Sequence, residues 1–274
     1  MTRAFSAGAV PAAPQSRPVL AESLSLPLLA WITGAIALAG LIHGALGFGF
    51  PFVATPLIAL ASDMRTAVFT VLVPTLAAVV VNIGMTGSLR STLMRFWMMP
   101  LYAIVGSFAG TTLFVLAPQI PYAALLAVII IVYLNLDRLG LGELPAARRH
   151  EQVFAPLSGI AAGFFEGTAN VAAPPLIIFY LALGLAPAVL VQALNVCFLV
   201  GKTIQFTVLS TRGGISLSQW AMTLPLAAVA TGTLLAGLRL RHRIDAQSFR
   251  VWVKRSLLVI AFVLLGEYVY SLLT

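Results

Sequence analysis

A few ionisable residues lie inside long apolar stretches of this sequence, and they are the first candidates for chemistry. Glu166 is the only acidic residue between Gln152 and Gly201, and Lys202 stands in an otherwise uncharged run. Ionisable groups in such segments are rare and costly, so they are functional candidates by default. We expect Lys202 to pair with Glu166 or to attract an anion, and Glu166 to carry a proton. The alternatives are a Glu166 wetted at a segment mouth and a Lys202 that reaches the edge of the apolar layer.

Neutral polar residues near these charges form a second set. His43 could relay a proton or bind an anion, because a histidine ordinarily titrates near neutral pH, or it could be a neutral ring hydrogen-bonded between helices. The amides and hydroxyls could coordinate a polar ligand or simply join helices. They are Asn82, Thr168, Asn170, Asn195, Thr203 and Gln205. We rank Asn170 and Asn195 first, because they lie beside a helix break or near Lys202.

The composition indicates that these residues belong to a membrane protein. Of 274 residues, 60% are hydrophobic and 9% are charged, whereas soluble proteins carry about 25% charged residues. The stretch 96–136 contains no Asp, Glu, Lys or Arg and could hold two spans of about 20 residues each. The net charge of +8 comes from basic residues in short breaks between apolar runs, which argues against nucleic-acid binding. The one cysteine, Cys197, excludes an intrachain disulfide and a thiolate metal cluster.

The apolar segments give the chain a domain plan. Residues 1–22 hold three prolines and no apolar core, which predicts a disordered tail. Repeat 1 is expected at 23–137, a basic cytoplasmic loop at 138–152, and repeat 2 at 153–274. Ten apolar segments are expected, at 24–46, 47–62, 66–86, 94–117, 120–136, 153–165, 169–185, 187–210, 217–238 and 254–273. Those at 47–62, 153–165 and 169–185 are short and contain Gly and Pro, as in re-entrant or discontinuous helices.

The two halves share a sequence pattern. Gly40, Gly44 and Pro56 recur 119 positions later as Gly159, Gly163 and Pro175, each set followed by the same Leu-Ile pair. A repeat of this kind predicts two units built on one plan.

The basic residues indicate how the halves are oriented, because Lys and Arg concentrate in cytoplasmic loops. If each half crosses the membrane an odd number of times, eleven basic residues lie on one side of the membrane and four on the other. If each half crosses an even number of times, the two sides carry eight and seven. The eleven are Arg90, Arg95, Arg138, Arg148, Arg149, Arg239, Arg241, Arg243, Arg250, Lys254 and Arg255. The four are Arg3, Arg17, Arg65 and Arg212. The sequence therefore predicts an all-α polytopic membrane protein of two inverted-topology repeats, with both termini outside.

Inverted repeats with broken helices are the recurring plan of secondary transporters, whose substrate site lies where the repeats meet. A break exposes backbone N–H groups that can bind an anion, and glycine lets a ligand approach the backbone. The alternative is that the small residues only allow helices to pack closely. The candidate substrate-binding residues at the breaks are Gly44, Gly47, Phe48, Gly49, Gly163, Gly167 and Thr168.

These motifs also carry a resemblance to a known family. The run Gly40-x3-Gly44-x2-Gly47-x-Gly49 leading to Pro56-Leu57, and the run Gly159-x3-Gly163-x3-Gly167 leading to Pro174-Pro175-Leu176, resemble the TauE/SafE family of membrane permeases and sulfite exporters. The resemblance covers residues 24 to 273. It implies a carrier in a bacterial-type plasma membrane for sulfite, thiosulfate, sulfonates or related organic acids. By position, it places half-helix breaks at Gly44, Gly47, Gly49, Gly163 and Gly167; the roles of Glu166 and Lys202 rest on physical reasoning alone.

We therefore expect a secondary transporter that exports a small anion by alternating access. Asn170, Asn195, Lys202 and Gln205 would complete the substrate site, with Glu166 and His43 coupling transport to protons. The expected partners are the anion and the lipid bilayer of the inner membrane, with no nucleic acid, cofactor or metal ion. An anion channel, and less strongly a membrane-embedded enzyme, are the alternatives; the direction, the coupling ion and the oligomeric state are left open.

Overall fold

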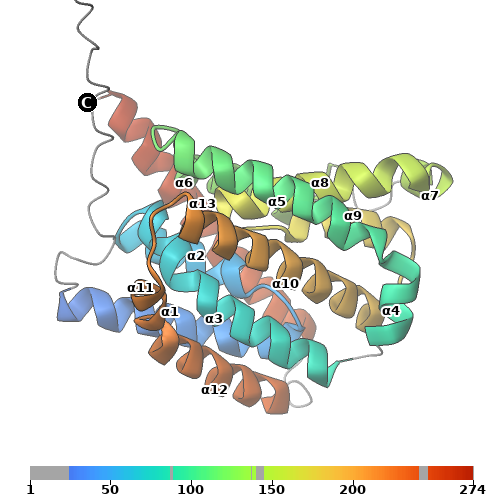
Figure 1. Ribbon diagram of the computed structural model, residues 1–274, viewed down its shortest axis with the longest axis horizontal. Helices are drawn as coiled ribbons and strands as arrows, with labels where there is room; N and C mark the ends of the chain where they lie inside the picture. The colour runs from blue at the N-terminus through green and yellow to red at the C-terminus, as the bar shows by residue number, and fades with distance from the viewer. Residues whose placement is uncertain (1–24, 87–88, 137, 140–144, 241–245, 274) are drawn as a thin grey trace, which may run out of the picture.

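The computed structural model describes residues 25–86, 89–136, 138–139, 145–240 and 246–273. The predicted tail at 1–22 and part of the predicted basic loop lie outside these residues. The described residues form helices and no strand (Figure 1). The helices are α1 Leu26–Leu46, α2 Phe50–Ala61, α3 Met64–Met85, α4 Leu89–Phe96, α5 Met98–Leu116, α6 Tyr122–Leu134, α7 Pro145–Arg149, α8 Glu151–Ala169, α9 Ala173–Ala182, α10 Pro187–Thr211, α11 Leu217–Ala221, α12 Leu224–Leu240 and α13 Ala246–Leu273.

Several helices are long and apolar enough to cross a membrane. Among the described residues there are five: α1, α3, α5, α10 and the stretch Leu217–Leu240, which combines α11 and α12. The helices α2, α6 and α9 are apolar but have only 12, 13 and 10 residues. A full span needs about 20 residues, so these short helices reach part of the way across. Each of the ten predicted apolar segments contains a helix, and the chain is an all-helical membrane protein.

Two helix pairs pack through their backbones. α1 lies along α12, and α8 lies along α5. A Cβ atom on Gly44 of α1 would lie 2.1 Å from the Leu234 carbonyl oxygen, and one on Gly163 of α8 would lie 2.1 Å from that of Ala103. Only glycine permits such contact, which gives the van der Waals packing that joins helices in lipid.

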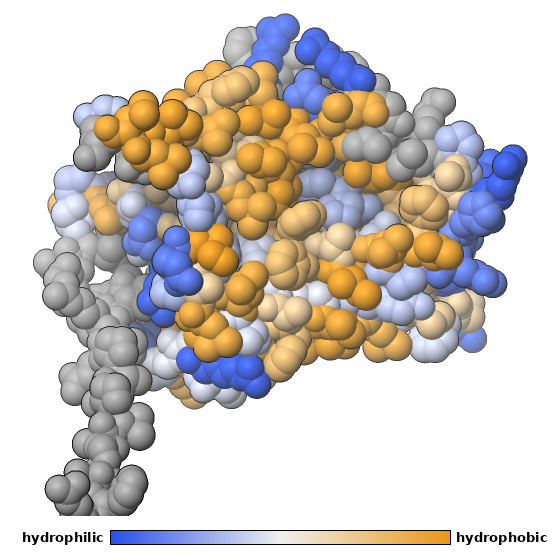
Figure 2. All heavy atoms as spheres, turned by 90° about the horizontal axis from the view of Figure 1, so that it is seen from above, coloured by the Kyte–Doolittle hydropathy of each residue, from blue (hydrophilic) through white to orange (hydrophobic). Residues whose placement is uncertain are grey.

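The outer surface suits a bilayer. Large apolar side chains of α5 are exposed, among them Leu101, Phe108 and Leu116. Figure 2 shows apolar surface across the middle of the molecule, with hydrophilic groups at the top and lower left and further hydrophilic residues along its right-hand end. In Figure 1, α4 and α7 lie at this end, whereas α11 and the C-terminus lie at the other. We call the end with α4 and α7 the basic end, because it carries Arg90, Arg95, Arg148 and Arg149.

Candidate functional site

Two interruptions of the helical chain line one small central cavity. The first, break 1, is the link Gly47–Gly49 between α1 and α2; the second, break 2, is the link Asn170–Ala172 between α8 and α9. Gly47 and Gly49 have φ of 88° and 104°, a left-handed backbone that glycine adopts without steric strain. Asn170 ends α8 with φ of 64° and is the only non-glycine residue in the described ranges with a positive φ. Asparagine tolerates this conformation better than most residues.

Break 2 is held by a buried network around Lys202. The Lys202 ammonium donates hydrogen bonds to Asn170 Oδ1 and, at 2.8 Å, to Gln205 Oε1. Its Nζ lies 3.6 Å from Glu166 Oε1. The Gln205 amide in turn donates to the Glu166 backbone carbonyl at 3.1 Å, so α10 closes the end of α8. All four residues are buried, with at most 1% of their surface exposed.

The burial of Lys202 and Glu166 decides between a paired site and the alternatives, a lysine that reaches the edge of the apolar layer and a glutamate wetted at a segment mouth. Lys202 is fully buried and points to break 2 rather than to the edge of the apolar layer. Glu166 is 1% exposed and pairs with Lys202. Two charges removed from water are tolerated only with good mutual geometry and further hydrogen bonds. The Asn170 and Gln205 contacts supply those bonds to the lysine.

One carboxylate oxygen of Glu166 is left without a hydrogen bond. Glu166 Oε2 is buried and has no hydrogen-bond partner among the described residues. It packs on Gly201, where any Cβ atom would lie 1.7 Å from it. Glu166 also lines a cavity of about 10 Å³ together with Gly49, Pro51 and Phe52 of the first half and the link and start of α9. Glu166, whose Oε2 has no hydrogen-bond partner in the described residues, therefore lines the small cavity at the N-terminal ends of α2 and α9.

Those two helix ends suit an anion. The first N–H groups of a helix have no partner within it, and its dipole favours negative charge there. Pro51, Pro174 and Pro175 lie in these first turns and carry no N–H, so the helix dipoles and a few remaining donors make the attraction. α2 and α9 have 12 and 10 residues, and neither has a side-chain cap at its start. The cavity that joins them has about the size of one water molecule, so the site is closed in this conformation.

Break 1 has a neutral polar network. The Gly47 carbonyl accepts hydrogen bonds from the amides of Asn82 at 2.6 Å and Asn195 at 2.8 Å. Asn82 Nδ2 also lies 3.2 Å from His43 Nε2. Asn82 belongs to α3 and Asn195 to α10, so both central helices hold the break. His43 is fully buried in this network, an arrangement that favours a neutral ring bonded between helices.

A hydrogen bond ties break 2 to the other half of the chain. The Asn170 amide donates to Thr55 Oγ1 of α2 at 2.8 Å. Thr55 was not among the predicted site residues, and nothing in its spacing marks it, because its partner lies 115 positions away. Ser107 Oγ donates across the halves to the Gly201 carbonyl at 2.8 Å, beside the surface on which Glu166 packs.

The structure separates the predicted break residues into two kinds. Gly47 and Gly49 lie in a break, and Phe48 and Gly49 line an apolar cavity of about 310 Å³. Gly44, Gly163 and Gly167 lie inside continuous helices that pack on α12 or α5, so the helix breaks predicted at these three positions are wrong. The second break comes three residues later than expected, after Gly167.

The remaining predicted polar residues fall into two groups: hydroxyls that bond within their own helix, and amides that belong to the networks at the breaks. Thr168 and Thr203 bond to carbonyls of their own helices, at 2.8 and 2.7 Å, as hydroxyls commonly do inside membrane helices. Asn170, Asn195 and Gln205 belong to the networks at the breaks. Among the described residues, no group of three His, Cys, Asp or Glu side chains is placed to hold a metal ion.

One of the three comparisons with known proteins gives a match, and it is to a single family. The family model described as sulfite exporter TauE/SafE matches residues 32–264, which is most of the chain. No curated protein and no solved structure matches the chain. The matched range includes both breaks, Glu166 and Lys202.

Proposed function

The chain belongs to the TauE/SafE sulfite exporter family, and from this premise we propose that it is a secondary transporter that exports sulfite, a sulfonate, thiosulfate or a related organic anion. Membership of a transporter family accounts for the apolar helices. The single observation that carries the proposal is the buried centre, where Glu166 pairs with Lys202 through Oε1, leaves Oε2 without a partner in the described residues, and lines the small cavity at the starts of α2 and α9.

Alternating access between inverted repeats is the proposed mechanism. The counterparts of α1, α3 and α5 in the second half are α8, α10 and α12. The packed pair α1–α12 is therefore equivalent to the packed pair α8–α5, and α3 packs on its own counterpart α10. In Figure 1, α1 and α3 run from left to right, while their counterparts α8 and α10 run from right to left. Likewise α5 and α12 run in opposite directions. These features support two copies of one plan threaded through the bilayer in opposite senses.

The basic end supports an orientation in which it faces the cytoplasm. Arg90, Arg95, Arg148 and Arg149 lie there, and the C-terminus and the start of α1 lie at the other end. Because Lys and Arg concentrate in cytoplasmic loops, both termini would lie on the outer side of the inner membrane.

In this mechanism the closed centre is an occluded state. A cavity of about 10 Å³ holds no more than a water molecule, so an anion with several oxygens needs the halves to move apart. The apolar cavity of about 310 Å³ reaches break 1 at Phe48 and Gly49 and offers room for such opening. A continuously open channel would need a wider path at the centre, so this geometry favours a carrier.

The anion would take the place that Glu166 now holds against Lys202. A second negative charge beside Glu166 would face a single ammonium in a site without water, and like charges in such a site disfavour each other. The anion and an ionised Glu166 therefore exclude each other, which favours protonation of Glu166 as the anion binds. His43 would have the lesser role, since its Nε2 is already bonded to Asn82. Net movement would then be one anion with one proton.

The membrane potential sets the direction for an uncoupled anion. An inside-negative potential favours efflux of each negative charge by about 2.3 kcal/mol per 100 mV. Export of an anion without a proton therefore gains from the potential. A monovalent anion that moves with the proton of Glu166 carries no net charge, and its direction is set by the gradients of the anion and of the proton.

The test is flux of sulfite and related anions in proteoliposomes. Lys202→Met should reduce the initial flux about 10- to 100-fold, since hydrogen bonds to a charged group contribute about 1.5–3 kcal/mol. Arg212→Met is the matched control, because it removes an exposed positive charge that stacks on Phe108 far along the helix. If the Lys202 variant is inserted to the same level as wild type and its flux is equal, Lys202 is not part of the anion site. The double variant Lys202→Met with Glu166→Gln guards against misfolding, since it leaves no unpaired charge.

A further inference from the structure

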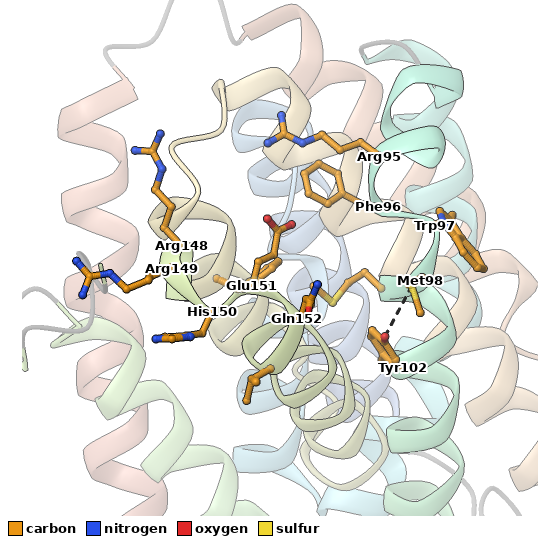
Figure 3. A pocket seen from close by; sticks show the side chains of 14 residues that line it. Arg95, Phe96, Trp97, Met98, Tyr102, Arg148, Arg149, His150, Glu151 and Gln152 are labelled. Atoms are coloured by element: carbon orange, nitrogen blue, oxygen red, sulfur yellow. Dashed lines mark hydrogen bonds between the residues drawn. The ribbon is translucent and has the colours of Figure 1, made fainter. Parts of the chain in front are cut away.

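A third cavity, far from the buried centre, opens at the basic end. Its volume is about 750 Å³, and its walls come from the junction of α4 with α5, the junction of α7 with α8, and α9 (Figure 3). Glu151 of this cavity and Glu166 of the buried centre lie on the same helix, fifteen positions apart. At 1.5 Å per residue that is about 22 Å, so the two sites are separate.

The cavity is positively charged. Arg95, Arg148 and Arg149 line it, against the single carboxylate of Glu151. The Arg95 guanidinium lies over the Phe96 ring, 5.0 Å from its centroid. Within the described part of the chain, the side chains of Arg148, Arg149 and Glu151 make no hydrogen bond or ion pair. Figure 3 shows Arg95 and Glu151 extending toward the space between the helices, with Arg148 at its rim. The guanidinium groups of Arg95 and Arg148 are thus available to an anion from outside, while Arg149 adds positive charge at the wall and its side chain points away from the space in Figure 3.

Apolar side chains flank these charges. Trp97 and Met98 line the cavity and are 58% and 44% exposed, and Val153 on the opposite wall is 56% exposed. One turn further along α8, Leu157 is 59% exposed. A tryptophan at this level is typical of the membrane interface. A ligand held here would meet guanidinium groups at one end and an apolar helix flank at the other.

We propose that this cavity binds an anionic phospholipid, with its phosphate among the arginines and its acyl chains along the exposed flank of α5 and α8. Arginine matches a phosphate with two parallel hydrogen bonds, and basic pockets between membrane helices at the cytoplasmic side suit acidic headgroups. A free phosphate or a substrate anion would use the same guanidinium groups but not the apolar flank. The combination of both surfaces therefore commits the site to a lipid.

The experiment measures lipid binding to the purified full chain in detergent. Phosphatidylglycerol is titrated and bound lipid is counted by native mass spectrometry, with phosphatidylcholine as the neutral comparison. The triple variant Arg95→Gln, Arg148→Gln, Arg149→Gln should bind phosphatidylglycerol about 100-fold more weakly, the effect of three basic residues near an anionic headgroup. Arg148→Gln alone should weaken binding about fivefold, which keeps the test valid if the triple variant is poorly folded.

A matched variant separates a site from diffuse attraction. Arg90, Arg138 and Arg255 are exposed and do not line the cavity, so changing all three to Gln alters the net charge equally. This control should keep binding within about twofold of wild type if the arginines of the cavity form a site. Equal losses in both triple variants would overturn the proposal. So would equal binding of phosphatidylcholine, or full competition by glycerol phosphate or inorganic phosphate, which would identify a free-anion site. None of these outcomes depends on transport, so the lipid site and the proposed function stand or fall separately.

Discussion

Removing one charge of the Lys202–Glu166 pair should destabilise the protein more than removing both. Lys202 Nζ lies 3.6 Å from Glu166 Oε1, and both side chains are buried. At an effective dielectric of about 20, two unit charges at this distance attract by about 5 kcal/mol. Desolvation offsets part of that attraction, and breaking a buried pair from one side typically costs about 3–5 kcal/mol. We expect a coupling free energy of about 2–3 kcal/mol in a double-mutant cycle.

The two single variants should differ in severity. Glu166→Gln leaves the ammonium with two acceptors, Asn170 Oδ1 and Gln205 Oε1. Lys202→Met leaves Glu166 with neither oxygen bonded, because Oε2 already has no partner in the described residues. A buried charge without partners is the more unfavourable state, so Lys202→Met should be the less stable of the two.

The assay is reversible unfolding of the purified protein in mixed micelles of mild detergent and dodecyl sulfate, followed by tryptophan fluorescence. Wild type, both single variants and the double variant give the four corners of the cycle. The double variant should be more stable than the sum of the single effects predicts. Additivity within about 0.5 kcal/mol, the range found for independent sites, would refute an interacting buried pair and with it the proposed competition between Glu166 and the anion.

Two further predictions concern packing and topology. Gly163→Ala should destabilise the protein, since its Cβ would lie 2.1 Å from a backbone oxygen of α5, whereas Gly34→Ala meets no atom within 4 Å and should be neutral or gain up to about 1 kcal/mol in the unfolding assay. In a Cys197→Ser background, Gln119→Cys and Arg239→Cys should react with a membrane-impermeant maleimide from opposite faces of the membrane, because they end equivalent helices of inverted repeats. Equal destabilisation by the two alanine substitutions would contradict close packing of α8 on α5 at Gly163. Labelling of both cysteines from the same face of the membrane would contradict the inverted topology.

The charged centre could be predicted from the sequence because charge inside an apolar segment is a strong signal. Glu166 and Lys202 stand out in runs where every neighbour is apolar or neutral, and placing such a group in lipid without a partner is costly. The same reasoning pointed to Asn170, Asn195 and Gln205, all of which belong to the networks at the breaks. The apolar segments themselves followed from length and hydropathy, as expected where lipid is the solvent.

Glycine spacing was the weaker signal, because one residue type serves two purposes. Gly163 and Gly47 look alike in the sequence, yet Gly163 allows α8 to touch α5, while Gly47 has a left-handed backbone that ends α1. The second break depends instead on Asn170, a residue that tolerates a positive φ, followed by Pro174 and Pro175 at the start of α9. Contacts between distant segments, such as Asn170 with Thr55, leave no local pattern to read.

The hydrogen bonds at the two breaks indicate which contacts alternating access would change. Within the first half, Asn82 holds the Gly47 carbonyl, and within the second, Lys202 and Gln205 hold the end of α8. The hydrogen bonds that cross between the halves in the described residues include Asn195 to Gly47 and Asn170 to Thr55 at the breaks. Further crossing bonds run from Ser107 to Gly201 and from Thr86 to Gln192. If the halves rock, each break can move as a unit with the central helix of its own half, while the crossing bonds at the breaks open and the packing of α1 on α12 and of α8 on α5 shifts. Each is an uncharged hydrogen bond worth about 1 kcal/mol, whereas the Lys202–Glu166 pair lies within one half, so rocking alone leaves it intact and separation of that pair requires the anion or a proton.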